Sequence, residues 1–261
     1  MSYAFISGAT GGIGKAFTKE LASMGNDLFL TGRSQDKLNA LKDEIILSYH
    51  VKVEVYPCDL VSEDERNKMV LYIESKSITF NKIINVAGVD IQKPFMDYTK
   101  EKVLKQIRVN AESTICLTHS LLKLKADSCE VVTISSMSGA SPMPYFALYS
   151  ATKAMLINFY KSLHIELKKD NVKVTVVMPG GVYTRPDVIK DIKGQGLWGK
   201  LSAKTPEFVA KKSLKAVKRN KKLLIPGFFN KFLYHFMKIV PESIKLKFIA
   251  NRWKKQTKDA F

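Results

Sequence analysis

The chain is poor in cysteine, and its three cysteines form no recognisable metal-binding or redox spacing. Cys58, Cys116 and Cys129 are odd in number, lie far apart and make neither a C-x-x-C pair nor a Cys/His cluster. We expect them to be reduced intracellular thiols. Neither a disulfide framework nor a metal site is therefore predicted.

Long apolar runs are missing as well. No apolar stretch is long enough to cross a bilayer, and the chain runs directly into a strand-like segment from Tyr3 instead of a basic and then apolar leader. We therefore expect a cytoplasmic protein. The chain also lacks internal repeats and low-complexity linkers, and 261 residues with 46% hydrophobic content can bury one good core. A single domain is predicted.

Acidic residues are scarce beside basic ones. The chain has 24 Asp and Glu against 42 Lys and Arg, and residues 204–261 carry +13 of the net charge of +18. Such a basic tail is suited to an anionic membrane surface, nucleic acid or an acidic substrate. The alternative is compositional: 36 of the basic residues are lysine, which is ordinary on solvated helix faces.

Runs rich in branched residues alternate with helical patterns, which is typical of β-α units that build a parallel sheet. The predicted strands are Tyr3 to Ser7, Leu28 to Thr31, Val51 to Tyr56, Lys82 to Asn85, Glu130 to Ser135 and Lys173 to Met178. The predicted fold class is α/β, a doubly wound parallel sheet of the Rossmann type. Residues 1–203 are expected to form the dinucleotide-binding and catalytic core, and residues 204–261 a basic amphipathic helical extension of the same domain.

Two helix starts are readable from capping residues. Ser62 with Glu65 forms a capping-box pattern, and Thr205 precedes Pro206 as N-cap and first helical residue.

A glycine-rich loop follows the first predicted strand. Ser7 to Gly14 reads Ser-Gly-Ala-Thr-Gly-Gly-Ile-Gly, ahead of a helix expected to begin near Lys15. The absence of side chains lets backbone N–H groups and the helix N-terminus approach a pyrophosphate. A tight turn without a ligand would also explain a glycine cluster. The position after the first strand favours the dinucleotide site.

The second strand ends at Gly32, where an NAD-binding protein usually places an acid for the ribose hydroxyls. Arg33 next to it is suited to the 2′-phosphate of NADPH. Its alternative role is that of a solvated surface arginine. Asp59 is a candidate acceptor for the adenine amino group, or else a cap for the next helix.

Tyr149 and Lys153 lie one helical turn apart on the same face. The spacing alone proves little in this lysine-rich chain, since three other pairs share it. What distinguishes this pair is Ser136, which follows a predicted strand thirteen residues before Tyr149, with small residues in the connection. The other pairs are Tyr72/Lys76, Tyr98/Lys102 and Tyr234/Lys238.

Six ordered motifs resemble those of the short-chain dehydrogenase/reductase family, over nearly the whole chain from the glycine loop to at least Thr184. Ser7 stands where that family usually has threonine, Val86 replaces its second asparagine, and Gly11 lies where many NADPH-using members have a basic residue. The preference for NADP(H) over NAD(H) therefore depends mainly on Arg33. The motifs are Gly8-x-x-x-Gly12-x-Gly14, Asn85-Val86-Ala87-Gly88, Asn110, Ser136, Tyr149-x-x-x-Lys153, and Pro179-Gly180 followed by Thr184.

The resemblance implies an NADPH-dependent reduction of a carbonyl to an alcohol, or the reverse oxidation. It implies that Tyr149 donates or removes the substrate proton and that Ser136 orients the carbonyl oxygen. Lys153 would lower the pKa of the tyrosine and bind the nicotinamide ribose, because a free phenol with a pKa of about 10 is a poor base near neutrality. Asn110 would hold a water that links the lysine to solvent, or else cap the helix that follows.

The glycine loop and the resemblance together predict one set of cofactor residues. It consists of Gly8, Thr10, Gly12, Ile13, Gly14, Arg33, Asp59, Leu60, Asn85, Ala87, Gly88, Tyr149, Lys153, Pro179, Gly180, Val182 and Thr184.

The segments expected to face the substrate are apolar, which favours a lipophilic ketone or acyl chain over a sugar. Core packing is the alternative for any one of these side chains. The tail also resembles the branch that contains very-long-chain 3-ketoacyl reductases and 17β-hydroxysteroid dehydrogenases. We expect a homodimer or homotetramer. The apolar residues are Met137, Met143, Tyr145, Phe146 and Leu148 near the active helix, and Val182, Tyr183, Leu197 and Trp198 in a lid.

The tail has two amphipathic stretches, before and after Pro241. Their apolar stripes either cover the substrate cleft, pack in an oligomer, or lie on an anionic membrane. In the first stretch Asn230, Lys231, Tyr234, His235 and Lys238 are predicted on the other faces. The stripes are Phe229, Phe232, Leu233, Phe236 and Val240, then Ile244, Phe248, Ile249 and Trp253, followed by basic residues up to Lys255.

Two other classes of function compete with an enzyme. A non-catalytic NADPH-binding regulator would not need the complete set of Asn110, Ser136, Tyr149 and Lys153. Nucleic-acid binding would use the aromatic residues of the basic tail as stacking platforms, but at helical spacing such residues more often form a buried stripe. Nucleic acid is therefore not expected as a partner.

Overall fold

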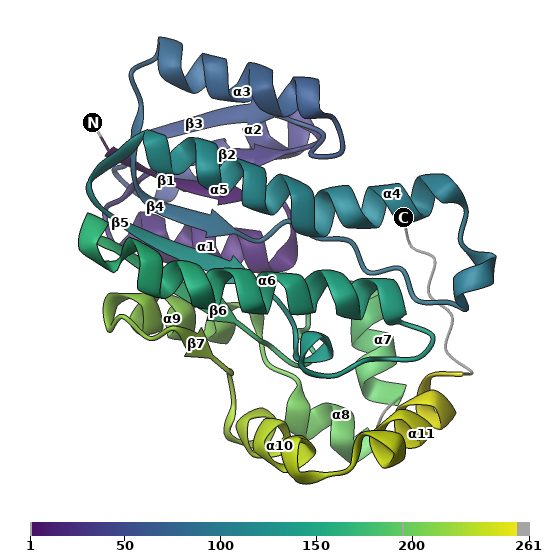
Figure 1. Cartoon of the computed structure of the whole chain (residues 1–261). Coiled ribbons are helices and arrows are strands. Elements are labelled where there is room, and N and C mark those ends of the chain that lie inside the picture. The colour runs from purple at the N-terminus through teal and green to yellow at the C-terminus, as the bar shows by residue number, and fades with distance from the viewer. Residues whose placement is uncertain (1, 195, 255–261) are drawn as a thin grey trace.

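Seven parallel strands form one sheet in the order β3-β2-β1-β4-β5-β6-β7 (Figure 1). The computed structural model describes residues 2–194 and 196–254, and for Trp198 its backbone alone. The order reverses between β1 and β4, which is the switch point of a doubly wound sheet. The strands are β1 (Ser2–Ser7), β2 (Asp27–Gly32), β3 (Val53–Pro57), β4 (Thr79–Asn85), β5 (Lys125–Ile134), β6 (Val172–Val177) and β7 (Leu223–Leu224).

Helices connect the strands and cover both faces of the sheet. A π-helical turn, Arg108–Glu112, joins α4 to α5. The helices are α1 (Gly12–Ser23), α2 (Gln35–Ser48), α3 (Glu63–Ser75), α4 (Lys100–Ile107), α5 (Ser113–Lys123), α6 (Ala147–Glu166), α7 (Pro186–Gly194), α8 (Gly196–Ser202), α9 (Pro206–Lys218), α10 (Phe228–Ile239) and α11 (Glu242–Trp253).

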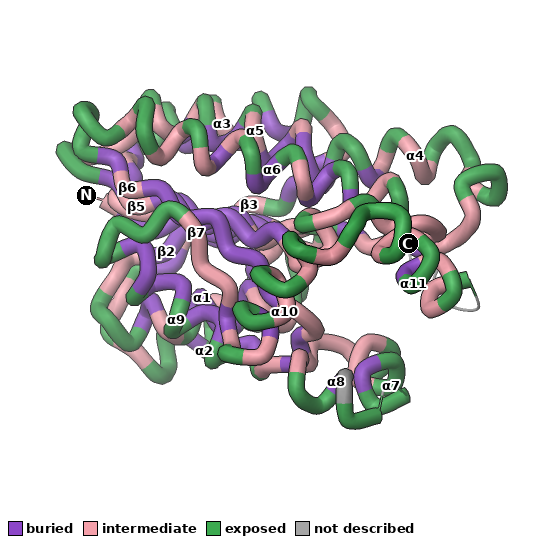
Figure 2. Tube along the Cα trace, turned by 60° about the horizontal axis from the view of Figure 1, so that its bottom comes forward, coloured by how far each residue is buried: buried purple, intermediate pink, exposed green. Residues whose placement is uncertain are grey.

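Alternate residues of each strand feed two separate cores, because side chains of a strand point to opposite faces. Ile6 and Leu30 pack with α1, α2 and α9 on one face. Phe5 and Phe29 pack with α3, α5 and α6 on the other. Figure 2 shows the buried strands between these two helical layers. The predicted fold class is confirmed.

The strands predicted from sequence all form, with different ends. β5 begins at Lys125, five residues before the predicted start. β7 was not predicted, since a strand of two residues has no alternation to read; it pairs with Val176 and Val177 of β6. α1 begins at Gly12 and not near Lys15, so the helix starts inside the glycine loop.

Both predicted helix caps form, but the capping box is only half made. The hydroxyls of Ser62 and Thr205 accept hydrogen bonds from the N–H groups of Glu65 and Phe208, each at 3.2 Å. The carboxylate of Glu65 does not return to Ser62. It accepts from the N–H of Asp59 at 2.6 Å and so fastens the end of β3 to α3.

The predicted extension does not form one structural unit. Its first part, α9 and β7, belongs to the sheet layers, and α9 packs against α1. After Gly227, whose φ is +92°, α10 and α11 lie with α7 and α8 at one side of the sheet (Figure 1). A boundary at residue 203 remains a prediction. Among the described residues, no helix is both long and apolar enough to span a bilayer.

Candidate active site

A cavity of about 1080 Å³ opens where the strands end. Its walls begin at the glycine loop and finish on α10 and α11. The carboxyl ends of parallel strands at the switch point are the usual ligand site of such sheets. Seventeen of the nineteen predicted site residues line this cavity, and the side chains of Asn85 and Asn110 do not.

Three glycines of the loop are required by close packing. Gly8 has φ +65°, and a Cβ there would lie 2.9 Å from the Cα of Ala87. A Cβ at Gly14 would overlap the carbonyl oxygen of Gly8, and one at Gly12 would lie 3.0 Å from Thr184. Gly11 is the N-cap of α1 and provides no side-chain cap. The first N–H groups of α1 therefore face the cavity in a way that suits a phosphate.

The end of the cavity where the adenosine is predicted to bind is basic. Arg33 lines it and is exposed, and Lys37, one turn into α2, lines it too. Sequence reasoning missed Lys37, although its spacing of four residues from Arg33 was a usable signal. Asp59 also lines this end; its carboxylate accepts from the N–H of Val61 at 3.1 Å. The cap of α3 is Ser62, which removes the alternative role considered for Asp59.

Asn85 stabilises the sheet and does not reach the cavity. Its Nδ2 donates to the hydroxyls of Thr118 at 2.9 Å and Thr133 at 3.1 Å, inside the core. Ser7 has a similar role at the strand ends, because its hydroxyl accepts from the N–H groups of Val86 and Ala87 at 3.1 and 3.3 Å. These bonds hold the loop after β4 against the glycine loop.

Tyr149 and Lys153 project from α6 toward Ser136, which follows β5. The Lys153 Nζ donates to the carbonyl of Ile134 at 3.1 Å and lies 5.6 Å from the centre of the Tyr149 ring. The Ser135 hydroxyl donates to the carbonyl of Lys153 at 2.8 Å. A Cβ at Gly139 would lie 2.7 Å from the Lys153 backbone, so the connection must be small for α6 to sit this close.

Asn110 is fully buried in the π-helical turn. Its Oδ1 accepts from the N–H of Val89 at 2.7 Å, and its Nδ2 donates to the Val89 carbonyl at 2.9 Å and to the Thr152 hydroxyl at 3.2 Å. Its side chain therefore does not cap α5. It joins the loop after β4 to α6, and π-helical turns are frequent at functional sites.

Burial shifts the two titrating groups in opposite directions. It raises the pKa of Tyr149, and Asp90 raises it further, while a hydrogen bond with Ser136 and the charge of Arg185 lower it. Burial lowers the pKa of Lys153 to about 8, against an opposing effect of Asp90. The pKa of Tyr149 is therefore raised and not lowered as expected, because burial disfavours the phenolate.

A model of the family described as short chain dehydrogenase matches residues 2–190. The chain belongs to this family. The family predicted from the motifs is thereby confirmed.

Curated relatives of this short-chain dehydrogenase are reductases. Very-long-chain 3-oxoacyl-CoA reductase of Bos taurus is 33% identical over 221 residues, which are 82% of this chain and 68% of that protein. The reductase of the same name from Candida glabrata is 31% identical over 67% of this chain, which spans 55% of that protein. The 3-oxoacyl-(acyl-carrier-protein) reductase of Aquifex aeolicus is 34% identical, with 69% and 73% covered.

Solved structures agree on the fold. A 7β-hydroxysteroid dehydrogenase has a TM-score of 0.87 and 26% identity, with 95% of this chain and 96% of that chain covered. A short-chain dehydrogenase from Sphingobium yanoikuyae in complex with NADPH has a TM-score of 0.78 and 21% identity, with both chains fully covered.

The active site of this short-chain dehydrogenase also contains an ion pair that sequence reasoning missed. Arg185 lies 3.1 Å from the carboxylate of Asp90, and both side chains line the cavity. Asp90 comes two residues after Gly88, and Arg185 comes directly after Thr184. The signal in the sequence was an acidic residue just after one motif and a basic residue just after another. Only the fold shows that the two side chains meet.

The far wall of the cavity is apolar. Met137, Met143, Phe146 and Val182 line it as predicted. The Phe146 ring stacks on Tyr149 with centroids 4.4 Å apart and lies 6.2 Å from Trp253 of α11. Both predicted stripes of the tail also line it: Phe229, Phe232, Leu233, Phe236, Val240, Ile244, Phe248, Ile249 and Trp253.

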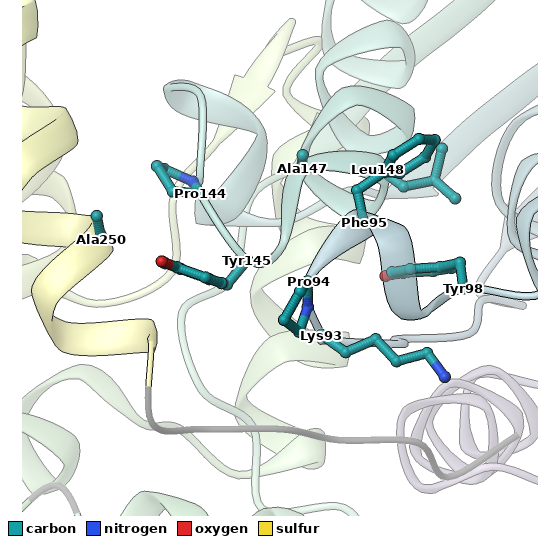
Figure 3. Close-up of a pocket in the computed structure, with 9 residues that line it drawn as sticks. All are labelled: Lys93, Pro94, Phe95, Tyr98, Pro144, Tyr145, Ala147, Leu148 and Ala250. Carbon is teal, nitrogen blue, oxygen red and sulfur yellow. The ribbon is translucent and has the colours of Figure 1, made fainter.

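The other predicted substrate residues lie elsewhere. Tyr145 and Leu148 line a separate pocket of about 260 Å³, where Tyr145 lies beside Ala250 of α11 (Figure 3). Leu197 is exposed, and neither it nor Tyr183 lines the cavity. The side chain of Trp198 lies outside the described residues, and so does Lys255.

Asn230 is buried, contrary to the prediction that it lies on a polar face of α10. Its Nδ2 donates to the carbonyls of Ser202 at 2.8 Å and Pro226 at 2.9 Å. A Cβ at Gly180 would lie 2.9 Å from the Asn230 amide, so the two residues are in close contact. Asn230 thus connects α8, α10 and the loop after β6.

Proposed function

We propose that this chain is an NADPH-dependent oxidoreductase that reduces a lipophilic ketone, a ketosteroid or a 3-oxoacyl group to an alcohol, or runs the reverse oxidation. The observation that carries the proposal is a single cavity with Tyr149, Ser136 and Lys153 between a glycine cradle and an apolar wall. The names of the reductase relatives support the substrate class.

The residues present fit a nicotinamide dinucleotide. The glycine cradle and the uncapped N-terminus of α1 suit the pyrophosphate, and Arg33 with Lys37 suits a 2′-phosphate. Lys153, Gly88 and the loop from Pro179 to Thr184 surround the remaining part of the cavity. When bound, the nicotinamide would supply the hydride.

The proton would come from Tyr149. Its raised pKa keeps the phenol protonated near neutrality, so that it donates to the oxygen of the carbonyl as the alcohol forms. The hydroxyl of Ser136, which is hydrogen-bonded with the phenol, orients that oxygen. A positioned acid of this kind contributes about 10² to 10⁴ in rate.

The test is a panel of ketosteroids, 3-oxoacyl thioesters and small aldehydes, followed by NADPH absorbance, with wild type and Tyr149→Phe. We expect turnover by the wild type and a loss of at least about 10²-fold in the variant, with NADPH binding retained in fluorescence titration. Undiminished reduction by the variant would contradict the mechanism. Absence of turnover by the wild type with all three classes of substrate would favour a non-catalytic NADPH-binding regulator.

We also propose that α10 and α11 rest on an anionic membrane, from which a lipid-like substrate enters. These helices expose six large apolar side chains, of which all but Phe228 and Ile239 also line the cavity: Phe228, Phe232, Phe236, Ile239, Ile244 and Phe248. Lys231, Lys238, Lys245 and Lys247 lie among them. Exposed aromatic side chains interleaved with lysines suit the interface of an anionic bilayer.

Co-sedimentation with vesicles tests the membrane proposal. Phe228 and Ile239 are 88% and 83% exposed and do not line the cavity, so Phe228→Ser/Ile239→Ser leaves the cavity walls intact. We expect the wild type to pellet with anionic but not neutral vesicles at low salt, and the double variant to stay in the supernatant. Leu47→Ser on α2, where Leu47 is 87% exposed, is the matched control and should pellet. Wild type remaining in the supernatant with anionic vesicles would overturn the proposal.

We propose that the protein works as a homo-oligomer in the cytoplasm. The outer faces of α4 and α6 support an assembly, because Leu104, Ile107, Met155 and Ile165 are exposed there. Light scattering of the purified protein tests this proposal, and a monomer at micromolar concentration would contradict it.

A further inference from the structure

Two charged side chains face the cavity that holds Tyr149 and have no part in the mechanism described above. Asp90 lies in the loop after β4, and Arg185 lies in the segment after β6, just before α7. Their ion pair, at 3.1 Å, crosses from one loop to the other. The pair therefore connects two segments that are distant in sequence and both line the cavity.

Both ends of the pair stand on backbone that is held in place. Asp90 follows Val89, whose N–H and carbonyl are both bonded to the amide of Asn110. Arg185 follows Thr184, which packs against Gly12 closely enough that a Cβ at Gly12 would lie 3.0 Å away. The charges are thus anchored to the predicted catalytic asparagine at one end and to the glycine loop at the other.

Arg185 also pairs with a second carboxylate, that of Asp187. Removing the charge of Asp187 can therefore be compared with removing that of Asp90. The Nε of Arg185 lies 3.2 Å from Asp187 of α7. The side chains of Arg185 and Asp90 are 37% and 28% exposed, so solvent screens their interaction in part. Asp187 does not line the cavity, whereas Asp90 does.

We propose that Asp90 and Arg185 are positioning residues that act as an opposed pair of charges on the phenol of Tyr149. This inference rests on the proposed function, in which that phenol exchanges the substrate proton. Asp90 favours the protonated phenol, and Arg185 offsets part of that effect. The balance between the two sets the pH range in which each direction of the reaction runs.

The charged groups that share the cavity with the phenol come from several elements. Lys153 faces it from α6, Asp90 from the loop after β4 and Arg185 from the segment before α7. Asp90 raises and Arg185 lowers the pKa of Tyr149, and Asp90 also raises the pKa of Lys153. The other charged residues of the cavity are Lys105 on α4, Asp191 on α7, Lys245 and Arg252 on α11, and Arg33, Lys37 and Asp59 at the adenosine end.

The first test is the pH profile of kcat/KM for alcohol oxidation, which needs the phenolate and therefore rises with pH up to the pKa of the phenol. Asp90→Asn removes the negative charge. We expect the low-pH limb of the kcat/KM profile of this variant to move to lower pH by about one unit. Arg185→Met removes the positive charge that lowers the pKa of the phenol, and the low-pH limb of this variant should move to higher pH. Asp187→Asn, the matched control, should keep the wild-type limb, and Arg185→Lys should restore it in large part.

The second test is independent of turnover. In the cofactor-free protein labelled with ¹³C at the tyrosine Cζ, the Tyr149 signal is assigned by its loss in Tyr149→Phe. We expect its titration to begin at lower pH in Asp90→Asn than in wild type, while the fold is monitored by circular dichroism. A purely structural pair would weaken all variants without moving the limb or the ¹³C titration.

The outcomes separate the two proposals. The role of the pair would be overturned if neither the low-pH limb of kcat/KM nor the ¹³C titration of Tyr149 moved. It would also be overturned if both moved in the same direction in Asp90→Asn and Arg185→Met. A shifted ¹³C titration in a protein that reduces no carbonyl would leave the electrostatic role of the pair intact and overturn the proposed function.

Discussion

At the scale of single residues, the adenosine end of the cavity offers a direct measurement of cofactor preference. Arg33→Ala should raise KM for NADPH about tenfold or more and leave KM for NADH nearly unchanged, because only NADPH carries the 2′-phosphate and a charged hydrogen bond contributes about 1.5–3 kcal/mol. Steady-state kinetics with both cofactors makes the comparison. Lys68→Ala, an exposed lysine on α3 outside the cavity, is the control, and equal effects of Arg33→Ala on both cofactors would refute the role.

Lys153 should make stability depend on pH. Its pKa is about 8 in the folded protein and about 10.5 in the unfolded chain, so between these values the unfolded state binds more protons and stability rises with pH. The cost of burying the cation is fully present below pH 8 and vanishes above the unfolded pKa. It amounts to at most about 3 kcal/mol.

Urea unfolding of the cofactor-free protein measures that cost. Lys153→Met should be more stable than wild type near neutral pH, and the difference should shrink as the pH approaches 10. A constant difference across this range would show that Lys153 is charged in the folded state.

The predicted site residues that the sequence groups most clearly are those that belong to one local pattern. Tyr149 and Lys153 share a helix turn, and the glycines of the loop share a turn between strand and helix. Asp90 and Arg185 are 95 residues apart and meet only through the fold. Asn85 was expected at the cofactor, but the pleat of β4 turns its side chain into the sheet, where three hydroxyls surround it.

At the scale of elements, α9 is the helix whose start is best defined by sequence. Thr205→Ala removes the hydroxyl that accepts from the N–H of Phe208, and we expect it to lower the free energy of unfolding by about 1 kcal/mol. Thr205→Ser keeps a capping hydroxyl and should remain near wild type in the same urea titration. A wild-type midpoint for the alanine variant would mean that packing of α9 against α1 alone fixes its start.

Other elements could not be predicted because tertiary contacts define them. The π-helical turn between α4 and α5 depends on Asn110 reaching Val89, which no local pattern encodes. β7 needs β6 as its partner. In α10 the apolar stripe was predicted correctly, whereas Asn230 was assigned to a polar face because asparagine is usually exposed, and it instead bonds two carbonyls in the interior.

At the scale of the whole molecule, one cavity is lined both by the region that the family model matches and by helices outside that region. The glycine loop, the strand ends and α6 come from the region that the family model matches, residues 2–190. The apolar wall of α10 and α11 comes from outside it. Charge and the spacing of apolar residues predicted that this tail is basic and amphipathic, but only the fold shows that its apolar stripes line the same cavity as Tyr149.

The contact between Asn230 and Gly180 has a consequence for ligand binding. If α10 shifted outward to admit a bulky substrate, Asn230 would lose its hydrogen bond to Ser202 and its packing against Gly180, beside the end of the cavity where the nicotinamide is proposed to bind. Occupancy at the two ends is then thermodynamically linked. If bound cofactor changes the affinity for the substrate by some factor, bound substrate must change the affinity for the cofactor by the same factor.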